Sequence, residues 1–268
     1  MKLIIQSDDF GVTNGVSYGT IDAILHGMIT CTGVFVNTVE GHLLKQLMEL
    51  QDHVCIGIDF NATCGKCVEH PGNIPHLTDT QGNFIKTKQR FTKEELEVLQ
   101  SDIKSEIYLE VKAQYDKFLQ LAGKKPEYLH EHAIGQEPFG YLEAIRRLSK
   151  ETGVPFTLDM FETYHVQGMS STLKNALQGK PYTIEWQLLN SSLDFFRMHG
   201  DELLAHEIAF LRVHAGFVDT DLLAISTYNM MRMKDHELVT SSYLKQWVQK
   251  QQIELISYRE LLKEEFEV

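Results

Sequence analysis

Short β-rich segments alternate with longer amphipathic segments along this chain, and several of the short segments end in an aspartate or a histidine. The residues at these ends are Asp8, Asp9, Asp59, His130, His132 and His214. Alternation of this kind is typical of βα units around a parallel sheet. The carboxyl ends of parallel strands meet on one side, where active sites assemble. The sequence therefore predicts an α/β fold with a polar site at that side.

The hydrophobic pattern predicts strands over residues 2–6, 31–36, 54–60, 128–131, 155–159, 209–214 and 253–256. It predicts helices over 14–27, 41–50, 93–122 (one helix or a pair), 139–152, 221–229, 235–250 and 257–264, with 188–199 and 201–206 helical or mixed. Residues 65–90 are predicted as a long loop and 162–180 as irregular. No repeat or Gly/Ser- or Pro-rich linker divides the 268 residues, so we expect one domain over 1–268.

The formal net charge of −12 argues against a nucleic-acid partner, because phosphate binding needs clustered Lys and Arg. Residues 1–11 reach acidic positions after a shorter apolar run than a signal peptide needs. No stretch approaches the roughly 20 apolar residues that span a bilayer. We therefore expect a cytoplasmic protein with no membrane partner. Its cysteines would be reduced thiols, namely Cys31, Cys55, Cys64 and Cys67.

The pair Asp8-Asp9 ends the first predicted strand and is followed by Gly11, which permits a sharp turn. Neighbouring strand residues point in different directions, so one carboxylate is placed to ligate a metal while the other acts as a base. In the alternative interpretation, Asp9 opens a turn or caps the next helix.

Asp59 lies in an otherwise apolar strand, where a buried carboxylate is costly unless it is paired or metal-bound. The alternative is that Asp59 lies at the edge of the strand and accepts hydrogen bonds from nearby backbone amides.

His130 and His132 flank Glu131 and share one face of a strand. Imidazole is a common ligand of zinc and similar ions. A lone histidine is more often a core residue, but two at a strand end favour a site.

His214 stands between a strand and a Gly-containing turn, where it is placed to donate a proton to a leaving amine. An ordinary loop histidine is the alternative.

Cys64 and Cys67 have the spacing of half a zinc knuckle, but structural zinc needs four ligands and no second pair of this spacing is present. Two loop thiols are therefore the favoured interpretation.

Taken together, these segments resemble the YdjC-like carbohydrate deacetylases, a family that includes chitooligosaccharide deacetylase. The resemblance covers nearly the whole chain and rests on the order of its motifs. They are SDDFG (7–11), GIDFNAT (57–63), DTQGNF (79–84), GKKPEYLHEHAI (123–134), HAGFVD (214–219) and the tail Tyr228-x3-Arg232-x4-Glu237-Leu238. It implies a distorted (β/α) barrel related to polysaccharide deacetylases, a divalent metal, and hydrolysis of the N-acetyl group of an amino sugar or chito-oligosaccharide. A small carbohydrate substrate and a homodimer are further expectations of the resemblance.

By this resemblance Asp8 corresponds to the catalytic base and Asp9 to a metal ligand. His132 corresponds to the second metal histidine, and His214 to the histidine that assists the leaving group.

Three positions depart from the family pattern. Asp59 stands where the family has its first metal histidine, and His130 where it has the aspartate of DSH. Thr157 or Leu158 stands where the family has an arginine that helps to orient the catalytic carboxylate. That loss favours weaker activity or a different substrate.

We hypothesise that the first two departures are an exchange that leaves Asp9, Asp59 and His132 as ligands, with His130 beside them or as an alternative ligand. More oxygen ligands slightly favour Mg²⁺ or Mn²⁺ over Zn²⁺, and we expect Mg²⁺.

Two other functions are alternatives to sugar deacetylation. One is a metal hydrolase of the same fold that acts on another amide or ester. The other is a sugar-binding homologue with weakened catalysis.

Overall fold

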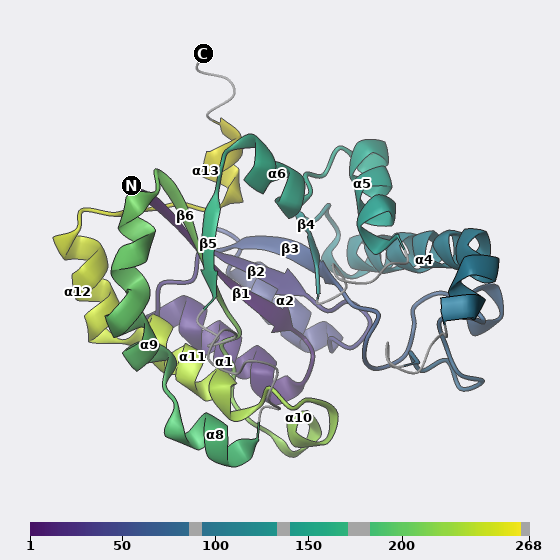
Figure 1. The fold of residues 1–268 in the computed structure, drawn as a ribbon, viewed down its shortest axis with the longest axis horizontal. Coiled ribbons are helices and arrows are strands. Elements are labelled where there is room, and N and C mark those ends of the chain that lie inside the picture. Colours follow the sequence, from purple (N-terminus) through teal and green to yellow (C-terminus); the bar gives the residue numbers. More distant parts are fainter. Residues whose placement is uncertain (86–92, 133–139, 171–182, 264–268) are drawn as a thin grey trace.

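The computed structural model describes residues 1–85, 93–132, 140–170 and 183–263, and its centre is a curled parallel sheet (Figure 1). The strand order is β4-β3-β2-β1-β6-β5, with β7 beside β1. Their bounds are β1 Lys2–Phe10, β2 Cys31–Val34, β3 Cys55–Phe60, β4 Leu129–Glu131, β5 Gln167–Ser170, β6 Ile208–Val213 and β7 Glu254–Leu255. An isolated parallel bridge between Leu129 and Phe156 continues the curl beyond β4. The α/β half-barrel confirms the predicted fold class.

Helices cover the outside of the curl and close one end of it. They are α1 Asn14–His26, α2 Gly41–Glu49, α4 Lys93–Ala122, α5 Tyr141–Thr152, α6 Thr157–Thr163, α8 Ile184–Leu189, α9 Ser192–His199, α10 Thr220–Ile225, α11 Met230–Thr240, α12 Ser242–Lys250 and α13 Tyr258–Lys263. Two short 3₁₀ turns are η1 Pro71–Asn73 and η2 Gly200–Ala205. In Figure 1, α1, α9, α11 and α12 gather beside β1 and β6, and α4 packs against α5 beyond β4.

Alternate residues of β1 enter two different cores. Leu3 and Ile5 join the large apolar cluster that the sheet shares with the outer helices. Ile4 belongs to a second cluster, to which α6 and α13 contribute Met160 and Tyr258. Because side chains alternate along a strand, Gln6 and Asp8 lie on the same face as Ile4, nearer the carboxyl end of β1. This inner face is therefore apolar at the amino ends of the strands and polar at their carboxyl ends.

The prediction of a strand over residues 155–159 is wrong. Only Phe156 makes a bridge, and α6 begins at Thr157. Thr157 and Met160 lie three residues apart and are both buried, which is the spacing of one helix face. The short apolar run was too brief to distinguish a strand from a helix.

Other boundaries also differ from the predictions. Strand β5 lies within the stretch predicted as irregular, and the predicted helix 235–250 is two helices. Ser241 separates them with an extended backbone, and its hydroxyl caps α12 by accepting a hydrogen bond from the Leu244 amide. The predicted helix 188–199 begins only at Ser192, after α8 has ended at Leu189. The predicted elements that reach into residues 86–92, 133–139, 171–182 or 264 extend outside the described residues.

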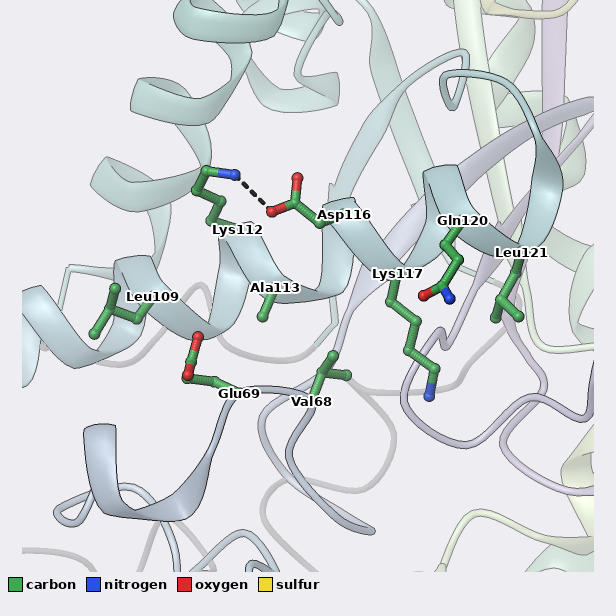
Figure 2. A pocket seen from close by; sticks show the side chains of 9 residues that line it. All are labelled: Val68, Glu69, Leu109, Lys112, Ala113, Asp116, Lys117, Gln120 and Leu121. Carbon is green, nitrogen blue, oxygen red and sulfur yellow. Dashed lines mark hydrogen bonds and ion pairs between the residues drawn. The ribbon is translucent and has the colours of Figure 1, made fainter.

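Buried carboxylates of α4 accept hydrogen bonds from backbone amides of the loop after β3. Glu110 accepts hydrogen bonds from the amides of Val68 and Glu69, and Glu106 accepts one from the amide of His76. Burial raises the pKa of Glu110 to about 7, although these hydrogen bonds oppose the shift. Figure 2 shows Val68 and Glu69 beneath α4, with a groove of about 540 Å³ between them and that helix.

Gly19 of α1 allows the loop after β6 to lie directly on that helix. A Cβ at this position would fall on backbone atoms of Gly216 and Phe217. Thr20 Oγ1 donates to the Ala215 carbonyl at 2.8 Å, and the Phe217 amide donates to the Gly15 carbonyl at 3.1 Å. This contact fixes the segment that immediately follows His214.

We expect Gly19→Ala to lower the free energy of unfolding by about 1–3 kcal/mol, because the added methyl group overpacks a backbone contact. Chemical denaturation measures the change. Gly41→Ala is the matched control, since a Cβ there meets nothing within 4 Å, and better helix propensity should leave it neutral or stabilising. Equal stability of the two variants would contradict the account.

Candidate metal and catalytic site

The end of β1 departs from regular strand geometry at Asp9. Its φ of 71° lies in the left-handed region, which side-chain-bearing residues rarely adopt, and the pairing of β1 with β2 shifts register between Ser7 and Phe10. In a regular strand Asp8 and Asp9 would face opposite sides of the sheet. With this bend both carboxylates reach the inner face, where Asp8 lies near His130 and Asp9 near His132.

Asp9, Asp59 and His132 form a group suited to a divalent cation. One ligand atom from each lies within 4.8 Å of the others, and His132 Nδ1 is 2.7 Å from Asp9 Oδ1. The Oδ1 atoms of both aspartates are buried and accept no hydrogen bond from the described part of the chain. Buried, unbonded carboxylate oxygens beside an imidazole nitrogen are the ligands a cation such as Mg²⁺, Mn²⁺ or Zn²⁺ would satisfy. The donor set therefore fits a metal.

The Oδ2 atoms of Asp9 and Asp59 accept hydrogen bonds from other groups of the protein. Arg232 Nη2 of α11 donates to Asp9 Oδ2 at 2.6 Å, and its Nε donates to the Tyr228 carbonyl at 3.1 Å. Asp59 Oδ2 accepts from the Asp9 amide at 3.0 Å. Burial alone would raise the pKa of Asp9, but His132 and Arg232 prevail and hold it well below its usual value. Asp9 is thus a fixed carboxylate whose Oδ1 is left for a cation.

Asp8 lies beside this group with partners of its own. Gln6 Nε2 donates to Asp8 Oδ1 at 2.5 Å, and Tyr258 Oη donates in turn to Gln6 Oε1 at 2.6 Å. Near Asp8 Oδ2 lie His130 Nε2 at 3.6 Å and Arg212 Nε at 3.4 Å. Burial would raise the pKa of Asp8, but the nearby His130 and then Arg212 lower it far below its usual range. Asp8 is therefore ionised at neutral pH.

His130 contacts Asp8 and does not belong to the three-residue group. Its Nδ1 lies 2.7 Å from Thr157 Oγ1 at the start of α6. Thr157 is one of the two residues expected where the family pattern has an arginine, and it holds the ring of His130 near Asp8. The positive charges near the two carboxylates come instead from Arg212 and Arg232.

His214 is fixed by a buried acid of α11. Its amide donates to Asp235 Oδ2 at 2.8 Å, and its Nδ1 lies 3.9 Å from the same oxygen. Asp235 also accepts from Tyr228 Oη at 2.9 Å and from Ser192 Oγ at 2.5 Å. Burial lowers the pKa of His214, although the charges of Asp9 and Asp8 oppose this. The imidazole lies 5.1 Å from the Tyr228 ring, centroid to centroid.

Several site residues went unassigned from the sequence. Gln6 and Arg212 each lie two positions before a predicted site residue on the same strand, so period-two alternation could have placed them on the inner face. Arg232 and Asp235 are three residues apart in α11, which indicates a shared helix face, but nothing in the sequence says that this face returns to β1. Cys64 and Cys67 are free thiols that contact Asn61 and the Glu69 carbonyl.

The fold and this cluster define an α/β half-barrel with an acidic and imidazole site at the carboxyl ends of its strands. Residues 2–250 match the family described as YdjC-like protein, and the chain belongs to this family. None of the helices within the described ranges is both long and apolar enough to cross a bilayer.

Relatives of similar length support the family assignment. Carbohydrate deacetylase 2 of Listeria innocua is 30% identical over 265 residues, covering 98% of this chain and 100% of the relative. Chitooligosaccharide deacetylase of Proteus mirabilis is 27% identical over 264 residues, covering 97% and 98%. A crystal structure from Enterococcus faecalis V583, of a protein whose name refers to cellobiose-phosphate cleavage, matches with a TM-score of 0.74 at 23% identity and covers 97% of this chain and 98% of that one.

We expect metal binding at this site to strengthen as pH rises and to release protons. Burial, followed by the charge of Asp8, raises the pKa of Asp59 to about 7. Burial would lower the pKa of His132, but Asp9 prevails and raises it to about 9. Both groups bind a cation only after losing their protons, so the affinity for Mg²⁺ or Zn²⁺ should increase with pH up to about 9.

Calorimetry in buffers of different ionisation enthalpy measures both the affinity and the released protons. The variant Asp59→Asn should bind more weakly and lose the pH dependence near 7 while keeping that of His132. An affinity that does not change with pH in the wild-type protein would rule out this ligand set.

Proposed function

We propose that this protein is a metal-dependent hydrolase that removes the acetyl group from an N-acetylated amino sugar or a chito-oligosaccharide. The observation that carries the proposal is the juxtaposition of three groups on one inner face. These are a cluster suited to a cation, a separate ionised carboxylate at Asp8, and His214 held by Asp235. The relatives named carbohydrate deacetylase and chitooligosaccharide deacetylase support the choice of substrate.

In this proposal Asp9, Asp59 and His132 hold the cation. Two of the three are carboxylates, which favours Mg²⁺, with Mn²⁺ and Zn²⁺ as alternatives. When bound, such an ion polarises an amide carbonyl and lowers the pKa of water. Arg232 keeps Asp9 ionised and oriented, and the Phe35 ring packs edge-on against His132 with ring centroids 4.6 Å apart.

Asp8 acts as the general base that accepts a proton from the attacking water. Its low pKa keeps it unprotonated at neutral pH, which is the state a base requires. Gln6 fixes its Oδ1, so Oδ2 is the oxygen directed toward the reaction. His130 and Arg212 stand beside Oδ2 and keep the carboxylate in this orientation.

His214 acts as the general acid toward the departing amine. In this role the imidazole must carry a proton when the amine departs. Burial lowers the pKa of His214 and so disfavours that state, whereas the charges of Asp9 and Asp8 favour it. Asp235 holds the backbone at His214 and keeps the ring near Asp8 and Asp9.

The arrangement favours an active enzyme over a sugar-binding homologue with weakened catalysis. That alternative depended on the altered ligand set, whose three members still lie together, and on the absent arginine near Asp8. Arg212 approaches Asp8 from β6 and supplies a guanidinium at the same carboxylate. A hydrolase that acts on another amide or ester would use the same groups, so only the substrate test separates it from the deacetylase.

We expect Asp8→Asn and His214→Ala each to reduce acetate release by about 10²–10⁴-fold, because each removes a proton-transfer group. The assay measures acetate from N-acetylated chito-oligosaccharides with added Mg²⁺, Mn²⁺ or Zn²⁺. The control His26→Ala changes a largely exposed histidine of α1 and should leave the rate unchanged. Full activity in either site variant, with folding confirmed by circular dichroism, would refute the role given to that residue.

A further inference from the structure

A cavity of about 240 Å³ lies on the inner face, between α6 and the β5–β6 strands. It is lined by Leu158, Phe161, Gly168, Met169, Phe210 and Arg212. Arg212 is the one charged residue in this lining and is also the residue that approaches Asp8. The cavity therefore adjoins the proposed catalytic base.

The guanidinium of Arg212 has unused capacity for hydrogen bonding. An arginine carries five N–H donors, and the buried Nε of Arg212 has no hydrogen-bond partner within the described part of the chain. Its Nε is buried 3.4 Å from Asp8 Oδ2 without hydrogen-bond geometry. The side chain as a whole remains 27% exposed, so a molecule in the cavity can reach it. Asp8 offsets part of the cost of desolvating this cation, and an anionic ligand on its remaining donors would offset more.

The rest of the lining restricts which anion fits. Aliphatic and aromatic side chains form the other walls, and Arg212 itself packs over the Phe210 ring at 5.6 Å. At about 30 Å³ per water molecule, the cavity has room for a group of about eight heavy atoms. A planar carboxylate pairs with a guanidinium through two parallel hydrogen bonds, and a short carbon chain suits the apolar walls.

Gly168 keeps space open beside the arginine. It pairs with Phe210 across β5 and β6, and a Cβ at this position would lie 3.1 Å from Phe210 Cδ1. A larger side chain at position 168 would therefore take up space against one wall of the cavity while leaving Arg212 in place.

We propose that this cavity is a carboxylate-binding subsite in which Arg212 pairs with the acid group and the apolar walls hold its short carbon chain. Two sources have this chemistry: the acid released by amide hydrolysis, and an acidic group carried by the substrate. The assignment to a step of catalysis rests on the proposed function, whereas binding of the carboxylate does not.

The test uses full-length protein stripped of metal with a chelator, so that the ligand group of Asp9 cannot capture the carboxylate through a cation. Binding of sodium butyrate and of its neutral isostere butyramide is followed by ligand-observed NMR and calorimetry. We expect butyrate to bind at least tenfold more tightly than butyramide. Arg212→Met should weaken butyrate binding at least tenfold.

Two further variants separate this role from a loss of folding. Gly168→Val should weaken butyrate binding although the arginine is retained. Arg147→Met removes an exposed arginine of α5 that lies outside the cavity and should bind butyrate as the wild type does. Equal binding of butyrate and butyramide would overturn the proposal. So would unchanged binding by Arg212→Met, or no binding of butyrate by the wild-type protein.

Comparing acetate with butyrate identifies the source of the carboxylate. Tighter binding of acetate supports the released acid, and tighter binding of butyrate supports a longer acidic group carried by the substrate. Both comparisons are made without turnover, so failure of the subsite and failure of the deacetylase proposal are observed in different experiments.

Discussion

Three carboxylates buried at one end of a curled sheet are the constraint on which the rest of the site depends. Asp8, Asp9 and Asp59 are 4%, 1% and 0% exposed. Charges taken out of water are costly unless they are paired, so the structure has to bring positive groups to this place. It does so with two histidines that follow β3 along the sheet and with two arginines, Arg212 and Arg232, from the last third of the chain. Strand β6 and helix α11 are thus tied electrostatically to the first strand.

The sequence departures from the family pattern make physical sense when they are considered together. Thr157 lacks the charge of an arginine but fixes His130, and His130 then contacts the same carboxylate oxygen as Arg212. Arg212 of β6 supplies a positive charge at that carboxylate. Asp59, which we expect at the place of the family's first metal histidine, has a buried Oδ1 without a hydrogen bond from the described part of the chain, as a metal ligand would.

Much of the architecture could be predicted because it depends on local periodicity. Segments such as α4, whose bounds match the prediction, and the strand ends that carry Asp59 and His214 follow directly from hydrophobic patterning. The left-handed conformation of Asp9 could not be predicted, because nothing local distinguishes it from a strand residue, yet it brings both carboxylates to one face. The ion pair between Asp9 and Arg232 spans 223 positions and depends on the complete fold.

In the proposed site one cation joins Asp9, Asp59 and His132. The most direct measurement is anomalous diffraction from crystals of the protein soaked in manganese. We expect a single strong peak in contact with a carboxylate oxygen of each aspartate and with the imidazole of His132, and loss of that peak in Asp59→Ala. A peak that leaves Asp59 without a metal contact, or that lies away from the end of β1, would contradict it.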